Sequence, residues 1–151
     1  GWINVDLHSD VSDLKCDLRK LEIASDSADA VAAIHVLEHF YEWEARDLLI
    51  EWMRVLKPGG KMILELPCMD KVFAYIHNCV VSKEPIQPFM SLFALYGDPK
   101  YKAEAMCHRW GWFETPLRLM LESAGLQRIE FCEPRYHFPF RDMRIECYKG
   151  S

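Results

Sequence analysis

The sequence lacks the patterns by which three classes of protein are usually recognised. Its six cysteines form no C-x-x-C pair, which argues against a zinc ribbon or a thioredoxin-like centre. No run of lysine and arginine could follow a phosphate backbone, so a nucleic-acid partner is not favoured. There is no signal peptide and no apolar stretch long enough to cross a bilayer, so we expect a cytoplasmic protein without a membrane partner. If the N-terminus is truncated, a targeting segment in the missing part remains an alternative.

The composition indicates one globular domain. A length of 151 residues suits a single domain, and half of the residues are hydrophobic, which allows a sizeable core. The net charge of −5 leaves a neutral or cationic small-molecule substrate, or a protein side chain, as a partner, and we allow for a homodimer. Cys132 and Cys147 stand in apolar, strand-like runs, so we expect reduced, buried thiols in an intracellular protein.

Strand-like and helix-like apolar patterns alternate along the chain. Short apolar runs predict six strands, at residues 1–7, 14–16, 29–34, 61–66, 126–132 and 143–148. Apolar residues at helical spacing from Ala45 to Leu56 predict a helix that ends at the K-P-G-G turn, residues 57–60. A later helix is expected to have Thr115 as its N-cap and Pro116 as its first residue, and to end at Gly125.

The segment at residues 69–112 is less regular. We expect a helix at residues 69–81, followed by short helical pieces and loops, because prolines and glycines recur at 84–101. On an α/β domain such a segment is usually a lid or a substrate-binding insertion. The chain is therefore expected to be one domain, residues 1–151, with an insertion at about 69–112.

The last two predicted strands are separated by only eight residues, 134–141. A parallel crossover needs about a dozen residues or more, so these strands should be antiparallel neighbours. The other strands alternate with helices, which indicates a parallel sheet with helices on both faces. The expected fold class is α/β, with three layers and a mostly parallel sheet that carries an antiparallel C-terminal strand.

Four stretches carry a resemblance to a known family, in the order GWINVDL, CDLRKL, DSADAVAAIHVLEHF and RVLKPGGKMILELP. The ordered set, above all H-V-L-E-H after one strand and L-K-P-G-G before the next, resembles the class I, Rossmann-like S-adenosylmethionine-dependent methyltransferases. It looks closest to short bacterial members of that family. The family has a seven-stranded sheet whose last strand is antiparallel, as the spacing above also predicts. The resemblance implies S-adenosylmethionine as the cofactor.

The sequence departs from that family at its start. The family's first strand and its G-x-G-type loop, which approaches the methionine part of the cofactor, should precede Trp2 and are missing. The chain is a fragment, receives the strand from another chain, or is degenerate. We favour the fragment, which a mass measurement of the natural product tests. Residues 1–151 alone are then expected to bind the cofactor poorly or not at all.

The resemblance assigns cofactor contacts to four residues near the N-terminus. Asp6 ends its predicted strand at the carboxyl edge of the sheet, where it would accept hydrogen bonds from both ribose hydroxyls, and Leu7 would pack near the adenine. Asp17 would accept from the adenine amino group, and the backbone amide of Leu18 would reach a ring nitrogen. Each aspartate has a plainer interpretation as a loop or turn residue.

Two histidines are the candidates for catalysis. His35 directly follows a strand, at the edge that in the family faces the methionine end of the cofactor and the methyl acceptor. It is expected to contact the cofactor and to orient the substrate or act as a general base. His108 closes the insertion, near a point where the family often has a histidine. The plainer interpretations are a helix-start histidine bonded to backbone and an aromatic cluster that packs the insertion onto the sheet.

A metal site is the weaker interpretation of the H-x-x-E-H pattern formed by His35, Glu38 and His39. On a helix these three side chains share one face, so three ligands for a divalent metal would converge. A related E-x-x-E-H arrangement binds metal in some methyltransferases. Here the first ligand differs, and V-L-E-H is also common where no metal is bound, so we expect no metal.

The expected function is transfer of a methyl group from S-adenosylmethionine to an acceptor that the sequence does not identify, by analogy a small molecule or a sugar. One competing hypothesis is a catalytically inactive methyltransferase-like binding module, motivated by the missing loop. Another is a nicotinamide-dependent oxidoreductase, which also places an acid after its second strand. The antiparallel terminal pair and the order of H-V-L-E-H and L-K-P-G-G count against the oxidoreductase.

Overall fold

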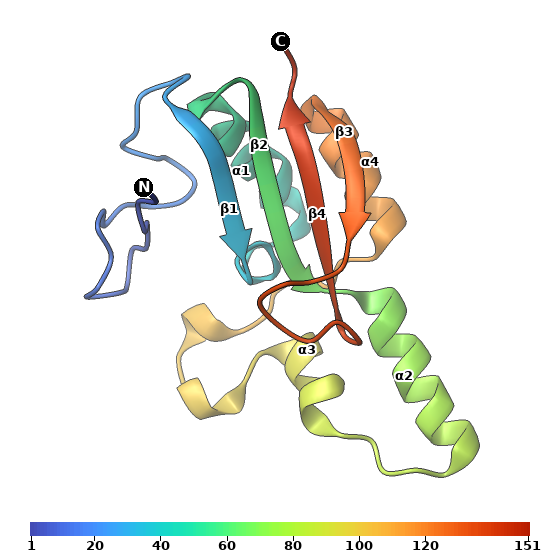
Figure 1. The fold of residues 1–151 in the computed structure, drawn as a ribbon. Coiled ribbons are helices and arrows are strands. Elements are labelled where there is room, and N and C mark those ends of the chain that lie inside the picture. The colour runs from blue at the N-terminus through green and yellow to red at the C-terminus, as the bar shows by residue number, and fades with distance from the viewer.

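The computed structural model describes all residues, 1–151, and is built around one sheet of four strands (Figure 1). The strands are β1 (Ala28–Ile34), β2 (Leu56–Pro67), β3 (Leu126–Cys132) and β4 (Asp142–Lys149), in the spatial order β1-β2-β4-β3. β1 and β2 are parallel, and β4 is antiparallel to both of its neighbours. Three strands thus run in one direction and the C-terminal strand runs against them, which confirms the predicted mixed sheet and the α/β class.

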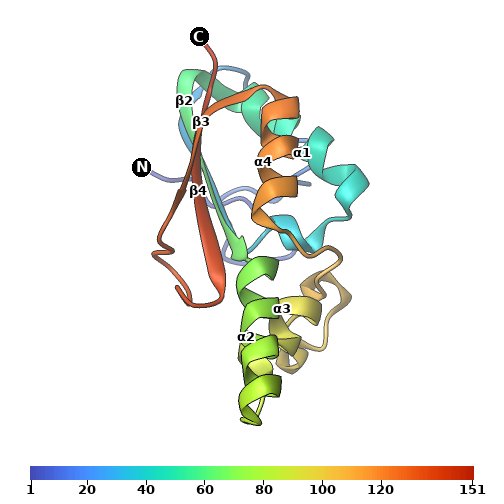
Figure 2. The same cartoon turned by 90° about the vertical axis from the view of Figure 1, so that its right-hand side faces the viewer.

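Two helices cover one face of the sheet (Figure 2). α1 (Glu42–Val55) joins β1 to β2, and α4 (Glu114–Ala124) precedes β3. The residues that α1 buries are those of the predicted stripe and its extension to the last turn, namely Ala45, Leu48, Leu49, Trp52 and Val55. Leu117 and Leu121 are buried in the same way from α4. The apolar periodicity therefore predicted both helices and the faces that they bury.

The alternation of side chains along β2 and β4 separates the two faces of the sheet. Six apolar residues that pair across these strands are buried in the main core: Met62, Leu64, Leu66, Met143, Ile145 and Cys147. The residues between them point to the opposite face, where Arg144 pairs with Glu65 and Glu146, and Lys61 pairs with Glu146. The prediction of helices on both faces is corrected for this chain, because the second face carries charged side chains that bind one another.

The K-P-G-G segment is a bulge inside β2. The strand begins at Leu56, before the turn, and its pairing with β1 skips residues 57–60. Gly59 has φ of 73°, which favours glycine, and a Cβ on Gly60 would lie 2.8 Å from the carbonyl oxygen of Lys57. The two glycines let the chain leave α1 and enter the sheet within four residues.

The first 27 residues contain no strand of the sheet, which corrects two predictions. The runs 1–7 and 14–16 are predicted as strands, yet a single parallel bridge between Val5 and Leu14 is all the pairing that they make. Neither run pairs with β1, whose outer edge has no partner strand and faces the N-terminal segment (Figure 1). Two short strands without a sheet to join are marginal in water, which explains the difference.

Side chains of α1 hold the N-terminal segment in place. Trp52 Nε1 donates to the carbonyl of Leu18 at 3.1 Å. The guanidinium of Arg54 donates to the carbonyls of Leu21 and Ile23 at 3.0 and 2.9 Å. Leu21 is also buried in the main core. The segment therefore packs beside the sheet as an irregular chain bound to α1.

Residues 69–112 form a helix followed by short pieces, as the sequence predicts. α2 (Met69–Ser82) is the one long helix of this segment, and it is followed by η2 (Pro88–Met90), α3 (Leu92–Tyr96), η3 (Pro99–Tyr101) and η4 (Glu104–Met106). The segment extends beyond the carboxyl edge of the sheet (Figure 1). None of the helices combines the length and the apolar character that a membrane crossing requires.

α4 begins slightly earlier than predicted. Its first residue is Glu114, so Thr115 and Pro116 lie inside the first turn instead of forming its cap. The carboxylate of Asp70, at the start of α2, accepts a hydrogen bond from the Glu114 backbone N–H at 2.9 Å. A side chain from another helix thus replaces the cap assigned to Thr115. The predicted end is correct, with Gly125 in the left-handed region at φ of 100°.

Candidate functional site

Three chain segments meet at the carboxyl edge of the sheet. β1 ends at Ile34 and β2 at Pro67, and the antiparallel β4 begins at the same edge, with Asp142 opposite Pro67. His35 is the next residue after β1, and its backbone N–H donates to the carbonyl of Glu65 at 2.7 Å. Open α/β sheets bind their ligands at this edge. The topology therefore gathers polar side chains from distant parts of the sequence at one place.

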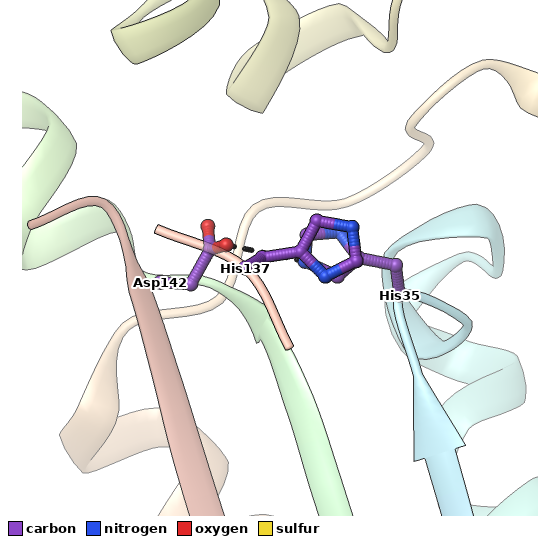
Figure 3. Close-up of side chains that lie close together, drawn as sticks. All are labelled: His35, His137 and Asp142. Atoms are coloured by element: carbon purple, nitrogen blue, oxygen red, sulfur yellow. Dashed lines mark hydrogen bonds and ion pairs between the residues drawn. The ribbon is translucent and has the colours of Figure 1, made fainter. Parts of the chain in front are cut away.

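His35 is held in a strained conformation at the end of β1. Its φ of 52° lies in the left-handed region, where a residue other than glycine is unfavourable by roughly 1–2 kcal/mol. Both ring nitrogens face carboxylates: Nε2 lies 3.2 Å from Asp142 Oδ2, and Nδ1 lies 2.9 Å from Glu38 Oε1. Figure 3 shows the imidazole directed from β1 toward Asp142, with the ring of His137 beside it. The centroids of the two histidine rings are 3.9 Å apart. Strain that the surroundings enforce in this way concentrates at functional sites.

His35 is a cation at neutral pH. Burial disfavours the charged imidazole, but the carboxylates of Asp142 and Glu38 outweigh burial and raise the pKa of His35 to about 9. Both ring nitrogens then carry protons. His35 is accordingly a hydrogen-bond donor in this state, and it can take a proton only after it has given one up.

Asp142 is the buried partner that orients His35. Its carboxylate is fully buried and accepts hydrogen bonds from Arg141 Nε at 2.6 Å and Nη2 at 3.0 Å. The backbone N–H of Phe138 adds a longer bond of 3.3 Å. Burial favours the neutral acid, but His35 and Arg141 outweigh burial and hold the pKa of Asp142 below its ordinary value. The carboxylate is therefore ionised in the folded protein at neutral pH.

The loop between β3 and β4, residues 133–141, is tied to the same edge by Glu65. The buried carboxylate of Glu65 accepts hydrogen bonds from three successive backbone N–H groups, those of residues 135–137, at 3.0, 2.8 and 3.0 Å. It also pairs with Arg144 Nη1 at 3.2 Å. Burial raises the pKa of Glu65, but these donors outweigh burial, and the net shift is downward. The loop, and with it the ring of His137, is thereby fixed at the site.

Glu38 faces two further histidines on the side away from Asp142. It lies in the short helix η1 (Leu37–His39), is 2% exposed, and accepts hydrogen bonds on its carbonyl from the N–H groups of residues 109–110. These bonds bring the neighbouring His108 to the carboxylate, with Nε2 4.0 Å from Glu38 Oε1. His39 packs edge-to-face against His108, with ring centroids 4.9 Å apart. The structure thus places His35 and His108, both predicted as catalytic, on either side of one buried carboxylate.

Neither carboxylate oxygen of Glu38 accepts a hydrogen bond. His35 Nδ1 is 2.9 Å from Oε1, close enough for an ion pair but out of line for a hydrogen bond. We describe this contact as electrostatic, because Coulomb attraction tolerates the poor alignment that weakens a hydrogen bond. The carboxylate therefore keeps its capacity to accept further bonds.

Asp6 and Leu7, two of the residues expected at the cofactor, lie in the N-terminal segment. Oδ1 of Asp6 accepts from the backbone N–H groups of residues 8–9 at 2.7 and 2.9 Å, and its second oxygen has no partner. Leu7 is exposed. No hydrogen bond or ion pair joins either residue to the cluster around His35.

Asp17 and Leu18, the other two, are engaged within the protein. Both oxygens of Asp17 bind the guanidinium of Arg19, at 3.0 Å from Nε and 2.8 Å from Nη2. The carbonyl of Leu18 accepts from Trp52, as described above. The bridge between Val5 and Leu14 is parallel, so Asp6 and Asp17 each follow a bridged segment in the same direction.

Residues 4–64 match the family model described as a methyltransferase domain. A methyltransferase from Archaeoglobus fulgidus has a TM-score of 0.62 at 16% identity, and the match covers 96% of this chain and 74% of that one. One from Thermotoga maritima has a TM-score of 0.59 at 14% identity, covering 90% of this chain and 63% of that one. One from Aquifex aeolicus has a TM-score of 0.54 at 17% identity, covering 89% and 53%.

The chain has the fold of the class I S-adenosylmethionine-dependent methyltransferases. At these identities the likeness to the solved structures concerns the fold. The chain spans less than two thirds of the Thermotoga and Aquifex methyltransferases, and 44% of a protein from Bordetella parapertussis that it also resembles. No curated protein matches the chain.

S-adenosylmethionine is the cofactor that this methyltransferase match implies. The free carboxylate oxygen of Asp6 fits a ribose hydroxyl, because both loop bonds go to the other oxygen. Asp17 fits an adenine amino group only when Arg19 moves aside, since both of its oxygens are occupied. The residues of this chain therefore fit the nucleoside through Asp6 first.

The interpretation of the sequence missed Asp142, Glu65 and His137. Asp142 had a signal, because the predicted antiparallel strand at 143–148 must begin at the carboxyl edge, next to the residue that follows the neighbouring strand. Glu65 also had one, as an acid inside the apolar run 61–66 that a covered strand rarely accepts unpaired. His137 lies in a loop, and nothing in the local sequence of the methyltransferase-like chain distinguishes it.

Proposed function

We propose that the protein transfers a methyl group from S-adenosylmethionine to an acceptor bound at the carboxyl edge of the sheet. The observation that carries the proposal is His35, a strained cation that directly follows β1 and is buried between the carboxylates of Asp142 and Glu38. The methyltransferase match at residues 4–64 includes this position. The fold places it at the edge where open α/β sheets bind ligands.

The cofactor, when bound, supplies a methyl group that is already activated by its sulfonium. The protein has mainly to hold the acceptor atom in line with the methyl–sulfur bond. In this proposal Asp6 binds the ribose and Leu7 packs near the adenine, while Asp17 and Leu18 contact the adenine edge. The free oxygen of Asp6 supports the ribose assignment.

His35 is the first catalytic candidate and His108 the second. In the proposal His35 donates a hydrogen bond that orients the acceptor, and it takes the acceptor's proton after it has released its own proton to water. His108 faces Glu38 from the other side at 4.0 Å. Burial lowers the pKa of His108, so its imidazole is neutral and has a lone pair with which to accept a proton.

The acceptor is proposed to be a small molecule or a sugar. The segment at residues 69–112, proposed as the substrate insertion, reaches the site through the bonds from residues 109–110 to Glu38. Such segments vary with substrate on a constant scaffold. A cytoplasmic location belongs to the same proposal and is supported by the six cysteines, all of which are free thiols.

A methyl-transfer assay on the protein in its complete natural form tests this proposal. Labelled S-adenosylmethionine is offered with hydroxyl, amine and sugar acceptors, and the label in the acceptor is counted. We expect His35→Ala to lower kcat by about 100-fold or more, as for the loss of a general acid–base group. His77→Ala, at an exposed position of α2, is the matched control and should leave the rate unchanged. A His35→Ala variant as active as the wild type contradicts the proposed site.

A binding module without catalysis is the second candidate. It is favoured because the polar atoms of two candidate site residues already have partners within the protein. Both nitrogens of His35 face carboxylates, and both oxygens of Asp17 are bound by Arg19. This alternative predicts that S-adenosylhomocysteine does not bind measurably and that no acceptor is labelled, and that His35→Ala changes neither result.

A further inference from the structure

The carboxylate of Glu38 is a buried polar group that lacks hydrogen-bond partners. It is 2% exposed, and neither of its oxygens accepts a hydrogen bond. A buried carboxylate oxygen without a hydrogen bond is unfavourable, and donors or a further cation at it would reduce that cost. The ion pair with His35 occupies one direction at Oε1 and leaves Oε2 without any partner.

The rings of His39 and His108 lie beside this carboxylate, and Nε2 of His108 is 4.0 Å from Glu38 Oε1. Nδ1 of His108 lies 2.8 Å from the carbonyl oxygen of Ala94, and Nδ1 of His39 lies 3.1 Å from the carbonyl oxygen of Cys107. A carbonyl only accepts, so each bond requires the proton on Nδ1. When either ring is neutral, its Nε2 carries no proton and can bind a metal, which is the tautomer and the outer hydrogen bond typical of metal-ligating histidine.

We propose that Glu38, His39 and His108 bind one divalent transition-metal ion. Their ligand atoms all lie within 4.8 Å of one another. That separation is close to twice the ~2.1 Å bond between a metal and an imidazole nitrogen, so small side-chain movements bring all three to one ion. The ion would bring ligand bonds to a buried carboxylate whose partner within the protein is the ion pair with His35.

The donor set selects the class of ion. Two imidazole nitrogens and one carboxylate suit Zn²⁺, Co²⁺, Mn²⁺ or Fe²⁺, whereas Ca²⁺ and Mg²⁺ prefer oxygen ligands alone. Three protein ligands leave at least one coordination position open to water or to another ligand. The arrangement of these three side chains supports the metal site whether or not the protein transfers methyl groups. With His108 as a ligand, His35 alone would remain for proton transfer.

The neighbouring group of His35, His137 and Asp142 has similar spacing but different chemistry. Asp142 is already bound through both oxygens by Arg141, and the same carboxylate holds His35. A metal there would displace a guanidinium and meet a histidine that is protonated on both nitrogens. The unsatisfied side of Glu38 is therefore the better site.

This site has a different third ligand from the site that the sequence pattern suggests. The H-x-x-E-H pattern offers His35 as the first ligand, and no metal is expected from it. In the structure Nε2 of His35 turns toward Asp142, and His108 takes the third position, 70 residues along the chain from Glu38. Sequence spacing alone does not reveal that exchange.

Titration of the metal-free protein with Co²⁺ tests the proposal, by calorimetry and by visible absorption. We expect one Co²⁺ per chain in the wild type, with the spectrum of nitrogen and oxygen ligands. Glu38→Gln and His108→Ala should each weaken binding by at least about 100-fold, more than the loss of an outer-shell partner. His77→Ala removes an exposed histidine of α2 and should bind Co²⁺ as the wild type does.

Three outcomes overturn the proposal. They are no saturable binding to the wild type, equal binding to Glu38→Gln, and a thiolate-to-cobalt absorption band that assigns the ion to a cysteine. If the variants do not fold, the wild type still decides, because a bound Co²⁺ shifts the NMR signals of nearby rings. Shifts of the His39 and His108 rings support the site, and shifts confined to other histidines refute it.

Discussion

The two sides of Glu38 differ in how completely their polar groups are satisfied. On the side of β4, Asp142 binds Arg141 and His35, and each of its carboxylate oxygens accepts a hydrogen bond. On the side of the insertion, the Glu38 carboxylate accepts none, and His108 directs a bare nitrogen toward it. Satisfied buried networks fix a structure, whereas unsatisfied ones indicate a missing ligand or a functional role. The first side therefore holds the site together, and the second is available for binding.

The largest predicted effect contrasts the two acids. Asp142→Asn leaves Arg141 without its buried counter-charge, removes one of the two carboxylates at His35, and should lower the free energy of unfolding by about 3 kcal/mol. Glu38→Gln relieves a buried carboxylate that accepts no hydrogen bond, at the cost of an ion pair with His35 that Asp142 still holds, and should change the free energy of unfolding by less than about 1 kcal/mol. Urea unfolding of metal-free protein measures both, with Asp10→Asn as an exposed control. Equal losses of unfolding free energy in the two variants would mean that the two carboxylates contribute equally to stability.

Once a metal ion is bound, the free energy of unfolding should depend strongly on Glu38. At a free Co²⁺ concentration about 100 times the Kd, the wild type should gain about 2.7 kcal/mol in the free energy of unfolding. Glu38→Gln should gain almost nothing, because the anionic ligand is gone. Thermal unfolding with and without Co²⁺, and again after chelation, provides the measurement. A gain of the same size in both proteins would place the ion elsewhere.

Glu65 gives a test of the satisfied side through pH. Its pKa is lowered in the folded state, so the unfolded chain binds more protons as the pH falls below about 5. The stability that Glu65 contributes is therefore complete above its unfolded pKa and is lost as the pH falls through its folded value. Glu65→Gln should cost about 2 kcal/mol at pH 7, since it breaks the ion pair with Arg144 and weakens the hydrogen bonds from residues 135–137.

The difference between Glu65→Gln and the wild type should shrink toward acid pH, because the wild-type carboxylate is then protonated as well. Glu84→Gln, at an exposed position, is the matched control and should follow the wild type throughout. A pH-independent difference would mean that the carboxylate is held by its shape rather than by its charge.

The smallest predicted effect isolates the backbone strain at His35. His35→Gly and His35→Ala lose the same imidazole contacts, but only alanine keeps a Cβ at φ of 52°. The glycine variant should therefore be more stable than the alanine variant by about 1 kcal/mol. Parallel denaturant titrations compare the two, and an alanine variant at least as stable as the glycine variant would show that the site does not enforce the strain.

The sequence predicted those parts of the fold that depend on local pattern. The stripe from Ala45 to Leu56 specified α1, and Gly125 specified the end of α4. The runs at 1–7 and 14–16 have the same apolar character as real strands, yet they do not join the sheet. A strand is stable only when it pairs with a neighbouring strand, and the local sequence pattern does not show whether such a strand is present.

The candidate site divides in the same way. His35 and Glu38 belong to one short motif, so their proximity follows from the sequence. His108 joins them only because the backbone of residues 109–110 bonds to the Glu38 carbonyl, and Asp142 joins them only through the register of β4. The antiparallel strand predicts that Asp142 lies at the carboxyl edge, but no spacing rule predicts its register or the contact of His108.

Calorimetric titration of the complete natural protein with S-adenosylhomocysteine tests the central claim, that this fold serves methyl transfer, most directly. The account predicts saturable binding, one molecule per chain, that Asp6→Ala weakens by at least about 10-fold through the loss of ribose hydrogen bonds to a carboxylate. Asp10→Ala, at a neighbouring exposed aspartate, should bind as the wild type does. Absence of binding, or identical binding by Asp6→Ala, would contradict the account.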